Sequence, residues 1–370
     1  MVRKLCIIAL VPLVLVSAGA GAGRDEVTVR AGASVDEFAA WLRAGDARGM
    51  LGEVGWPGDD PRWATVARHV YDRASLARLP VAAWATGEIW QRSYPLLAYH
   101  APEQYLPVSR AGPQAAVIEA RRTPAERGIS VEQGAFGEWG AGYDPVAATS
   151  PLSNERPGEY GRIYSYPGAA TYRFLAGRGI TWVRLPFRWE RLQRSPGGPL
   201  DAAELARVRA SLRAAGAAGL SVVLDCHNYG AYYLQQGSVA RRHPVGSAAV
   251  TSADFADLWA RIAVALRGER AVSGFALMNE PVGLPGGAAA WERASQAAVT
   301  AVRRTGNRTR IVVGSYHWGG TWQYARYHPR GPWIRDPARN TWYDAHLYFD
   351  ADRSGSYARS FDAELALRHR

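Results

Sequence analysis

A short apolar run that ends in polar residues decides the fold of this chain: Val272-Ser273-Gly274-Phe275-Ala276-Leu277-Met278-Asn279-Glu280-Pro281. Apolar residues at helical spacing lie on both sides of it, over Ala253–Leu266 and Ala288–Arg304. A strand between two helices is the repeating unit of a parallel sheet, because parallel strands need a long crossover connection. The stretch therefore predicts an α/β fold in which polar side chains follow the strands.

The same alternation of strands and helices continues in both directions along the chain. Six predicted strands follow residue 127: Gly128–Val131, Ile180–Leu185, Leu220–Asp225, Val272–Met278, Thr309–Gly314 and Thr341–Leu347. Two more come earlier, Met50–Val54 and Leu79–Trp84. Predicted helices connect them, including Val35–Arg43, Pro61–Leu76, Pro113–Arg122 and Ala202–Ala218. Eight strands with their helices predict a single closed (β/α)8 TIM barrel over residues 23–370.

A different division of the chain also fits this pattern. Residues 123–127 have the composition of a linker. The alternative to one barrel is therefore two domains, an N-terminal one over residues 23–122 and a six-stranded C-terminal one.

The first 22 residues read as a secretory signal peptide. Arg3 and Lys4 precede the apolar run Leu5–Val16, and small residues follow as far as Ala22. The run is too short to span a bilayer, so we expect cleavage, export to the extracellular space and no membrane attachment of the mature protein. Cys226 is then the only cysteine that remains, and we expect it to be a small, buried apolar residue.

The charge of the chain does not point to nucleic acid. The formal net charge of +11 falls to +9 without Arg3 and Lys4, and Lys4 is the only lysine. The arginines are spread along predicted helices and form no basic cluster with interleaved aromatic residues. We expect neither a nucleic-acid partner nor a second subunit.

Polar and aromatic residues lie at or just after the carboxyl ends of most of the predicted strands. A parallel barrel carries its active site at the carboxyl ends of its strands, so these residues form the candidate site. They are Glu53, Trp84, Arg184, His227, Asn228, Asn279, Glu280, Trp318, His346 and Tyr348.

Two glutamates in this set suggest hydrolysis of a glycosidic bond. A retaining mechanism needs two carboxyl groups about 5 to 5.5 Å apart, one to attack the anomeric carbon and one to protonate the leaving oxygen. Downstream of Glu280, Glu292 and Glu364 lie in predicted helices and do not reach the strand ends. Glu53 is the best-placed partner, and Glu132 and Glu138 are weaker alternatives.

The other candidate residues would support this pair. We expect Arg184 and the Tyr348 hydroxyl to keep Glu53 ionised, because a cation and a hydrogen-bond donor both favour a carboxylate. His227, His346 and Asn279 would orient the glutamates or bind sugar hydroxyls. The expected substrate-binding residues are Trp84, Trp90, Asn228, Tyr229, Trp318 and Trp322. No metal or other cofactor is expected.

Four segments resemble the family 5 glycoside hydrolases of the cellulase superfamily, and among them the endo-β-1,4-glucanases. They are Val183–Glu190, Leu224–Gly230, Phe275–Pro281 and Asp344–Asp350. The resemblance implies that Glu280, in Asn279-Glu280-Pro281, is the acid/base. It also implies a nucleophilic glutamate on a seventh strand, which in the family follows the sixth.

The expected seventh-strand segment does not follow Asp350. Its look-alike, Gly52-Glu53-Val54-Gly55, comes first, and Trp84 is similar to the family's eighth-strand tryptophan. The resemblance therefore implies a circular permutation in which strands 7 and 8 precede strands 1 to 6. Residues 23–122 would be equivalent to helix 6 through helix 8, and residues 128–370 to strand 1 through strand 6.

The sequence thus predicts a secreted, retaining glycoside hydrolase that cleaves internal β-1,4 bonds of cellulose-like glucans, with a β-glucan polysaccharide or oligosaccharide as its partner. Two alternatives stay open: a β-mannanase or other β-glycanase on the same scaffold, since fold does not fix the sugar, and an inactive polysaccharide-binding protein.

Overall fold

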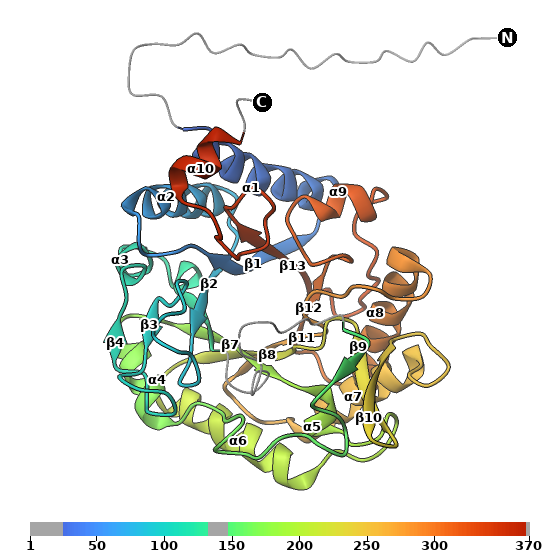
Figure 1. Cartoon of the computed structure of the whole chain (residues 1–370). Helices are drawn as coiled ribbons and strands as arrows, with labels where there is room; N and C mark the ends of the chain where they lie inside the picture. The colour runs from blue at the N-terminus through green and yellow to red at the C-terminus, as the bar shows by residue number, and fades with distance from the viewer. Residues whose placement is uncertain (1–24, 132–146, 368–370) are drawn as a thin grey trace, which may run out of the picture.

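Eight parallel strands close into one barrel in the computed structural model, which describes residues 25–131 and 147–367 (Figure 1). Around the barrel, the strands are β1 (Arg48–Gly55), β13 (Thr341–Tyr348), β12 (Arg310–Gly314), β11 (Val272–Ala276), β8 (Ser221–Cys226), β7 (Trp182–Phe187), β5 (Gly128–Val131) and β2 (Val81–Thr86). Every predicted strand is present, with ends shifted by at most two residues. The predicted signal peptide, Glu132 and Glu138 lie outside the described residues.

The N-terminal strands complete the barrel. β1 lies between β13 and β2, and Glu53 pairs with His346 in the register of β1 and β13. β2 in turn pairs with β5. Residues on both sides of the predicted linker therefore build one closed sheet. The linker itself contains a short 3₁₀ helix, Pro124–Glu126.

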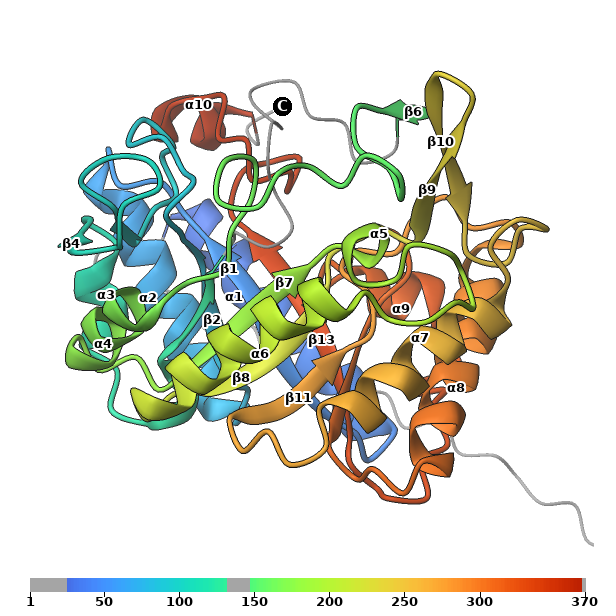
Figure 2. The same ribbon diagram turned by 90° about the horizontal axis from the view of Figure 1, so that it is seen from below.

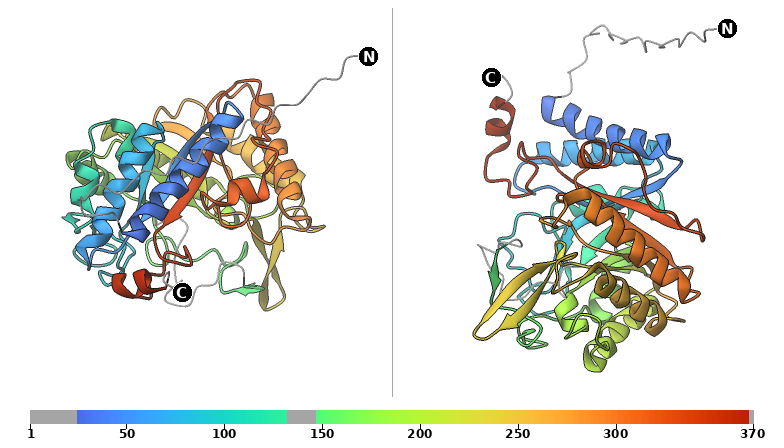
Figure 3. Two further views of the ribbon diagram at one scale, coloured as in Figure 1. Left: turned by 90° about the horizontal axis from the view of Figure 1, so that it is seen from above. Right: turned by 90° about the vertical axis from the view of Figure 1, so that its right-hand side faces the viewer.

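Helices surround the sheet, and Figure 3 shows α1 and α2 side by side on its outer surface. The helices are α1 (Glu26–Ala44), α2 (Pro61–Leu76), α3 (Ala115–Glu119), α4 (Ala169–Gly177), α5 (Trp189–Leu192), α6 (Ala202–Ala217), α7 (Ser252–Ala265), α8 (Gly287–Arg304), α9 (Gln323–Tyr327) and α10 (Phe361–Ala366). Aspartate or threonine side chains at Asp25, Asp60, Asp201 and Thr251 cap the first turns of α1, α2, α6 and α7, where backbone N–H groups lack partners. None of the described helices is long and apolar enough to cross a bilayer.

Apolar side chains form one layer of the barrel interior. This layer consists of Met50, Ala82, Trp182, Val223, Ala276 and Val312, with Trp342 packed against it. Gly128 makes room for the indole of Trp182, since a Cβ there would lie 2.2 Å from the ring. The interior is therefore a packed core, and the polar side chains gather above it, toward the carboxyl ends of the strands.

Short antiparallel strands add to the barrel and were not predicted. β9 (Ala231–Gln236) and β10 (Val239–Pro244) form a hairpin that also pairs with β6 (Thr149–Ser150). A smaller pair joins β3 (Tyr99–His100) to β4 (Arg110–Ala111). Figure 2 shows the β9–β10 hairpin standing on the side of the molecule on which α10 also lies. Both follow carboxyl ends of barrel strands, so they belong to the rim that carries the candidate site.

Candidate active site

A cavity of about 870 Å³ opens at the carboxyl ends of the strands. Nine of the predicted site residues line it: Glu53, Trp84, Trp90, Tyr229, Glu280, Trp318, Trp322, His346 and Tyr348. Arg184, His227 and Asn279 are buried and contact these residues, as described below. Residues distributed over most of the chain therefore meet at one place.

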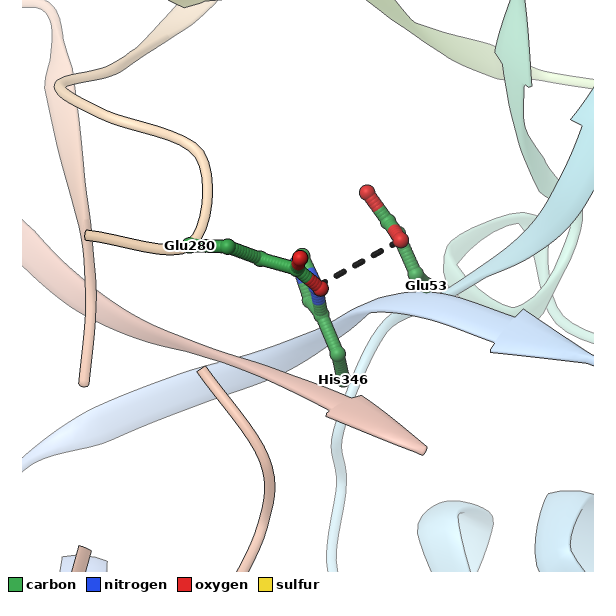
Figure 4. Close-up of side chains that lie close together, drawn as sticks. All are labelled: Glu53, Glu280 and His346. Atoms are coloured by element: carbon green, nitrogen blue, oxygen red, sulfur yellow. Dashed lines mark hydrogen bonds and ion pairs between the residues drawn. The ribbon is translucent and has the colours of Figure 1, made fainter. Parts of the chain in front are cut away.

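The two glutamates face the same space from different strands. Glu53 lies on β1 at a register shift, and Glu280 follows β11. In Figure 4 the three side chains converge, and the Glu280 carboxylate overlaps the His346 ring in this view. One carboxylate oxygen of each glutamate and one ring nitrogen of His346 all lie within 4.8 Å of one another. Carboxylates whose oxygens approach this closely fit the separation of about 5 to 5.5 Å in retaining glycosidases better than the roughly 6.5 to 9.5 Å of inverting ones.

Glu53 is almost completely buried and is held by three donors. An Arg184 Nη lies 2.7 Å from Oε1, and the Tyr348 hydroxyl donates to Oε2 at 2.7 Å. His346 Nδ1 lies 3.4 Å from Oε2. We expected Arg184 and Tyr348 to keep Glu53 ionised, and both do contact it. Burial has the larger effect, however, and raises the pKa of Glu53 to about 7 against the lowering by these three groups.

His346 carries a positive charge between the glutamates. Burial alone would lower its pKa, but the carboxylates of Glu53, Asp344 and Glu280 outweigh burial and raise the pKa well above the usual range. Its Nδ1 lies 2.7 Å from Oε1 of Glu280, and Nε2 lies 3.6 Å from Asp344 Oδ2. Glu280 is the more accessible glutamate, with 15% of its side chain exposed against 3% for Glu53.

A second set of hydrogen bonds lies beneath the pair. An Arg184 Nη donates to Asn279 Oδ1 at 2.6 Å, and Asn279 Nδ2 lies 3.0 Å from His227 Nε2. Burial, followed by the charge of Arg184, lowers the pKa of His227 well below its usual value, so the ring is neutral. Its Nδ1 then donates to Asp225 at 2.9 Å, and Nε2 accepts from Asn279. The network fixes the orientation of Asn279, the residue before Glu280.

Several residues that line the cavity have a left-handed backbone conformation. Glu280, Tyr229, His317 and Trp318 all have positive φ angles, between 42° and 71°, and all line the cavity. Residues with side chains rarely adopt this conformation, and strained backbone persists where surrounding structure enforces it, often at functional sites.

Aromatic side chains form most of the cavity wall. The Trp84 indole N–H donates to the Tyr94 hydroxyl at 2.8 Å, and Trp90 stacks on Tyr94 with ring centroids 4.2 Å apart. Tyr229 and Trp318 approach each other at 6.1 Å. Flat apolar rings with polar edges suit the faces and hydroxyl groups of sugars.

Asn228 does not belong to this wall, contrary to our expectation. Its side-chain Oδ1 accepts from the backbone N–H of Trp189 at 2.8 Å, and its Nδ2 donates to Glu190 at 2.8 Å and to the backbone oxygen of Ala231 at 3.1 Å. Only 1% of Asn228 is exposed, and it is not among the residues that line the cavity. Its side chain anchors α5 and the start of the β9–β10 hairpin.

Several site residues were missed by the sequence reasoning. Asp225 and Asp344 lie two residues before His227 and His346, so each pair points to the same side of its strand. That alternation was a signal in the sequence that we did not use. Tyr94, His317, Gln323 and the loop Asp352–Ser356 also line the cavity, but they lie in connecting segments without such a pattern.

The same three side chains could also hold a cation. Glu53, Glu280 and His346 are the group of potential metal ligands found within the described residues, with two carboxylate oxygens and one imidazole nitrogen converging. A metal bound there would occupy both glutamates.

Comparison with known proteins identifies the family of the chain. The family model described as "Cellulase (glycosyl hydrolase family 5)" matches residues 145–367 of the chain. The chain belongs to glycosyl hydrolase family 5. The matched residues include Arg184, Asn279, Glu280 and His346, whereas Glu53 lies before them.

Individual family 5 relatives cover part of the chain. A manganese-dependent endoglucanase from Phanerodontia chrysosporium is 28% identical over 227 residues, which are 59% of this chain and 53% of the relative. The chain spans about half the length of the curated relatives it matches. The crystal structure of an endoglucanase from Pseudomonas stutzeri in complex with cellobiose is 30% identical, with a TM-score of 0.52 over 62% of each chain. A triple mutant of an endo-β-1,4-glucanase from Xanthomonas axonopodis pv. citri is 31% identical, with a TM-score of 0.52 over 65% of this chain and 71% of that one.

Proposed function

We propose that the protein is a retaining endo-β-1,4-glucanase in which Glu53 is the nucleophile and Glu280 is the acid/base. The observation that carries this proposal is the convergence of the two carboxylates and His346 within 4.8 Å in an aromatic-lined cavity. Membership of family 5, and relatives named endoglucanases, support the β-1,4-glucan as substrate.

In the first step, Oε2 or Oε1 of Glu53 attacks the anomeric carbon of the sugar. The bond between that carbon and the glycosidic oxygen breaks, and Glu280 donates its proton to the leaving oxygen. The reducing-end fragment departs as an alcohol, and an ester joins the remaining sugar to Glu53. Arg184 and Tyr348 hold the Glu53 carboxylate in place for this attack.

In the second step, Glu280, now a carboxylate, removes a proton from water. The resulting oxygen attacks the anomeric carbon, the ester breaks, and Glu53 leaves as a carboxylate. Two inversions give net retention. His346 contacts both glutamates, so its positive charge stabilises whichever carboxylate is ionised.

Truncation of each glutamate tests this assignment. We expect Glu53→Ala and Glu280→Ala to lose turnover of carboxymethylcellulose by at least about a thousandfold, since each removes a participant in bond cleavage. With an activated aryl glucoside oligomer, azide should restore activity to both variants. The azide product of Glu53→Ala should have inverted configuration, and that of Glu280→Ala should have retained configuration.

A matched control is Glu292→Gln, which changes a glutamate on α8 that contacts His328 outside the cavity. It should keep turnover close to that of the unchanged protein. The unchanged protein should release a product whose anomeric configuration, read by NMR directly after cleavage, matches the substrate. Initial release of the opposite anomer would exclude the retaining mechanism.

The identity of the sugar needs its own comparison. We expect release of reducing ends from carboxymethylcellulose and glucomannan, with little from xylan or laminarin. Activity on pure mannan without activity on β-1,4-glucan would assign a mannanase. Affinity for glucan without turnover would assign a binding protein.

We infer in addition that the chain is circularly permuted relative to its family. In a closed barrel the cyclic order of the eight strands is the same wherever the chain starts, so strand order does not test the permutation. The support comes from the positions of the motifs along the sequence. The family match begins at residue 145, and Glu53 lies upstream of it. A rearranged gene that encodes residues 123–367 followed by a short linker and residues 25–122 should yield an active enzyme. Failure of that chain to fold, with several linker lengths, would count against the inference.

We also propose that the enzyme is exported, on the strength of the charged and apolar segments in residues 1–22. Expression of the full gene should deliver protein to the medium with an N-terminus after about residue 22. Retention of the uncleaved chain in the cell would contradict this.

A further inference from the structure

The loop after β13 brings a cation to the cavity that the proposed mechanism does not use. Asp352, Arg353, Ser354, Gly355 and Ser356 all line the cavity. This loop is held in one shape by Asp350, whose buried carboxylate accepts from the Ser354 hydroxyl at 3.0 Å and from the backbone N–H of Gly355 at 3.2 Å. A loop fixed in this way presents Arg353 at a defined place.

The guanidinium of Arg353 lies over the indole of Trp322. Its Cζ is 4.9 Å from the ring centroid, a distance typical of a cation–π contact. We predicted Trp322 as a stacking face for sugar. In the structure Trp322 lines the cavity and also supports Arg353, and Arg326 approaches the same ring at 5.9 Å. Trp322 is thus a positioning residue for a cation at the cavity wall.

Arg353 has no acidic partner close to it among the described residues. No ion pair within 4.0 Å joins it to a carboxylate there, and the acidic group that acts on its pKa is the more distant Glu37 of α1. Burial lowers the pKa of Arg353 by more than the charge of Glu37 raises it. The neighbouring Asp352 is engaged elsewhere, since its carboxylate accepts from the backbone N–H of Ser354 at 3.2 Å.

An arginine that is partly desolvated, has no carboxylate partner within the described part of the chain and is held by an aromatic ring is suited to binding a carboxylate. The planar guanidinium offers two parallel donors to the two oxygens of such a group, and the pre-positioned fork loses little side-chain entropy on binding. We propose that Arg353, held by Trp322, forms a subsite for a carboxylate-bearing unit of the glycan, so that the enzyme accepts acidic or carboxymethylated β-glucans in preference to neutral ones. This inference rests on the proposed glucanase function and specifies its substrate class.

The test compares two soluble cellulose derivatives that differ in charge, carboxymethylcellulose and hydroxyethylcellulose. For each protein, the ratio of kcat/KM on the charged polymer to kcat/KM on the neutral one is measured at low salt. Arg353→Gln should lower this ratio about threefold to fivefold, the effect expected from one accessible ion pair. In the unchanged protein, added salt should lower the ratio, and in Arg353→Gln it should have a smaller effect.

The control is Arg213→Gln, which removes one positive charge from the exposed face of α6, where Arg213 pairs with Glu269 at 3.0 Å. It should leave the ratio unchanged, because it alters only the overall charge of the protein. Equal ratios in the unchanged protein, Arg353→Gln and Arg213→Gln would overturn the inference. A fall of the same size in both variants would also overturn it, because attraction by the whole protein would then explain the preference.

Retardation in gels that contain either polymer repeats the comparison without turnover. If the unchanged protein hydrolyses neither polymer, the proposed function fails, and the gels still decide whether Arg353 selects the charged one. Equal retardation of the unchanged protein and Arg353→Gln by carboxymethylcellulose would reject the subsite.

Discussion

The phenol of Tyr348 donates a 2.7 Å hydrogen bond to Oε2 of Glu53, although 295 residues separate the two in the chain. This bond lowers the pKa of Glu53, which burial raises to about 7. Because the attacking carboxylate must be ionised, kcat/KM should fall as the pH drops below about 7 and level off above it. This dependence forms the acidic limb of the pH profile. A pH profile from about pH 5 to about pH 9 measures the limb. A limb centred near the ordinary glutamate pKa of about 4.3 would contradict this expectation.

Removal of the phenol should shift this limb upward. Tyr348→Phe deletes a donor to the ionised form of Glu53, so the pKa of Glu53 rises. A rise of about one pH unit should lower kcat/KM roughly fivefold near neutral pH. The matched control is Tyr99→Phe, which removes a phenol that donates to Glu119 at 3.1 Å. That variant should keep the position of the limb. A Tyr348→Phe profile that coincides with the control would show that the bond does not tune Glu53.

Loss of Arg184 should damage both stability and activity. Arg184 contacts Glu53 at 2.7 Å and Asp225 at 3.2 Å, and all three side chains are buried. Arg184→Met removes the guanidinium that pairs with two buried carboxyl groups, and we expect the free energy of unfolding to fall by about 3 to 5 kcal/mol. Urea denaturation and kcat/KM on soluble glucan are the measurements.

Arg303→Met separates these two effects. Arg303 pairs with Asp336 through two contacts of 2.8 and 2.9 Å in another buried ion pair, away from the cavity. It should lower stability by a similar amount and preserve kcat/KM in the folded fraction. Comparable activity losses in the two variants would mean that Arg184 acts only through stability.

Gly52 should resist substitution because Asp344 fills the space beside it. A Cβ at Gly52 would lie 2.2 Å from Asp344 Oδ1, so Gly52→Ala must displace either Asp344 or the strand that carries Glu53. We expect a loss of about 1 to 3 kcal/mol in stability and a larger loss of kcat/KM. Gly177→Ala, at the end of α4 with no neighbouring atom within 4 Å, should keep activity and match or slightly exceed the original melting temperature. An active Gly52→Ala variant of unchanged Tm would argue against this packing.

Replacement of Asn228 should lower the stability of the protein. Asn228→Ala removes the donor to buried Glu190 and the acceptor for the backbone of Trp189, which costs about 2 to 3 kcal/mol. KM for soluble glucan should change less than twofold or so, because the side chain lies outside the cavity. A tenfold rise in KM at unchanged Tm would restore the substrate-binding role that we first assigned.

The barrel strands could be predicted because each is an apolar run bounded by a helical pattern. Pro61–Leu76 of α2 and Gly128–Val131 of β5 were located to the residue. The β9–β10 hairpin was missed because Arg241, Arg242 and His243 interrupt its apolar alternation. Its first residues are fixed instead by Asn228 and Glu190, through contacts between segments 38 residues apart. Such pairing depends on tertiary structure and leaves no local pattern.

The site was predictable where residues sit at strand ends, since parallel strands end on one rim. Glu53, Glu280 and His346 were found in this way. Arg353 was not, because a loop residue has no periodic pattern, and its position depends on Trp322 and Asp350. The raised pKa of Glu53 was not predicted. The sequence suggests which donors surround a carboxylate, but it does not show how deeply that carboxylate is buried.

The pairing of β1 with β13 has a consequence for synthesis on the ribosome. β1 and β2 emerge first, yet one edge of β1 stays without its partner until residues 341–348 have been made. An unpaired parallel edge is prone to associate with other chains, and distant strand pairing slows folding. Nascent chains therefore carry an exposed edge until β13 has been made, and the closing strand that shields it also delivers His346 and Tyr348. Protection from aggregation and acquisition of hydrolytic competence thus arrive together, with the synthesis of a single strand.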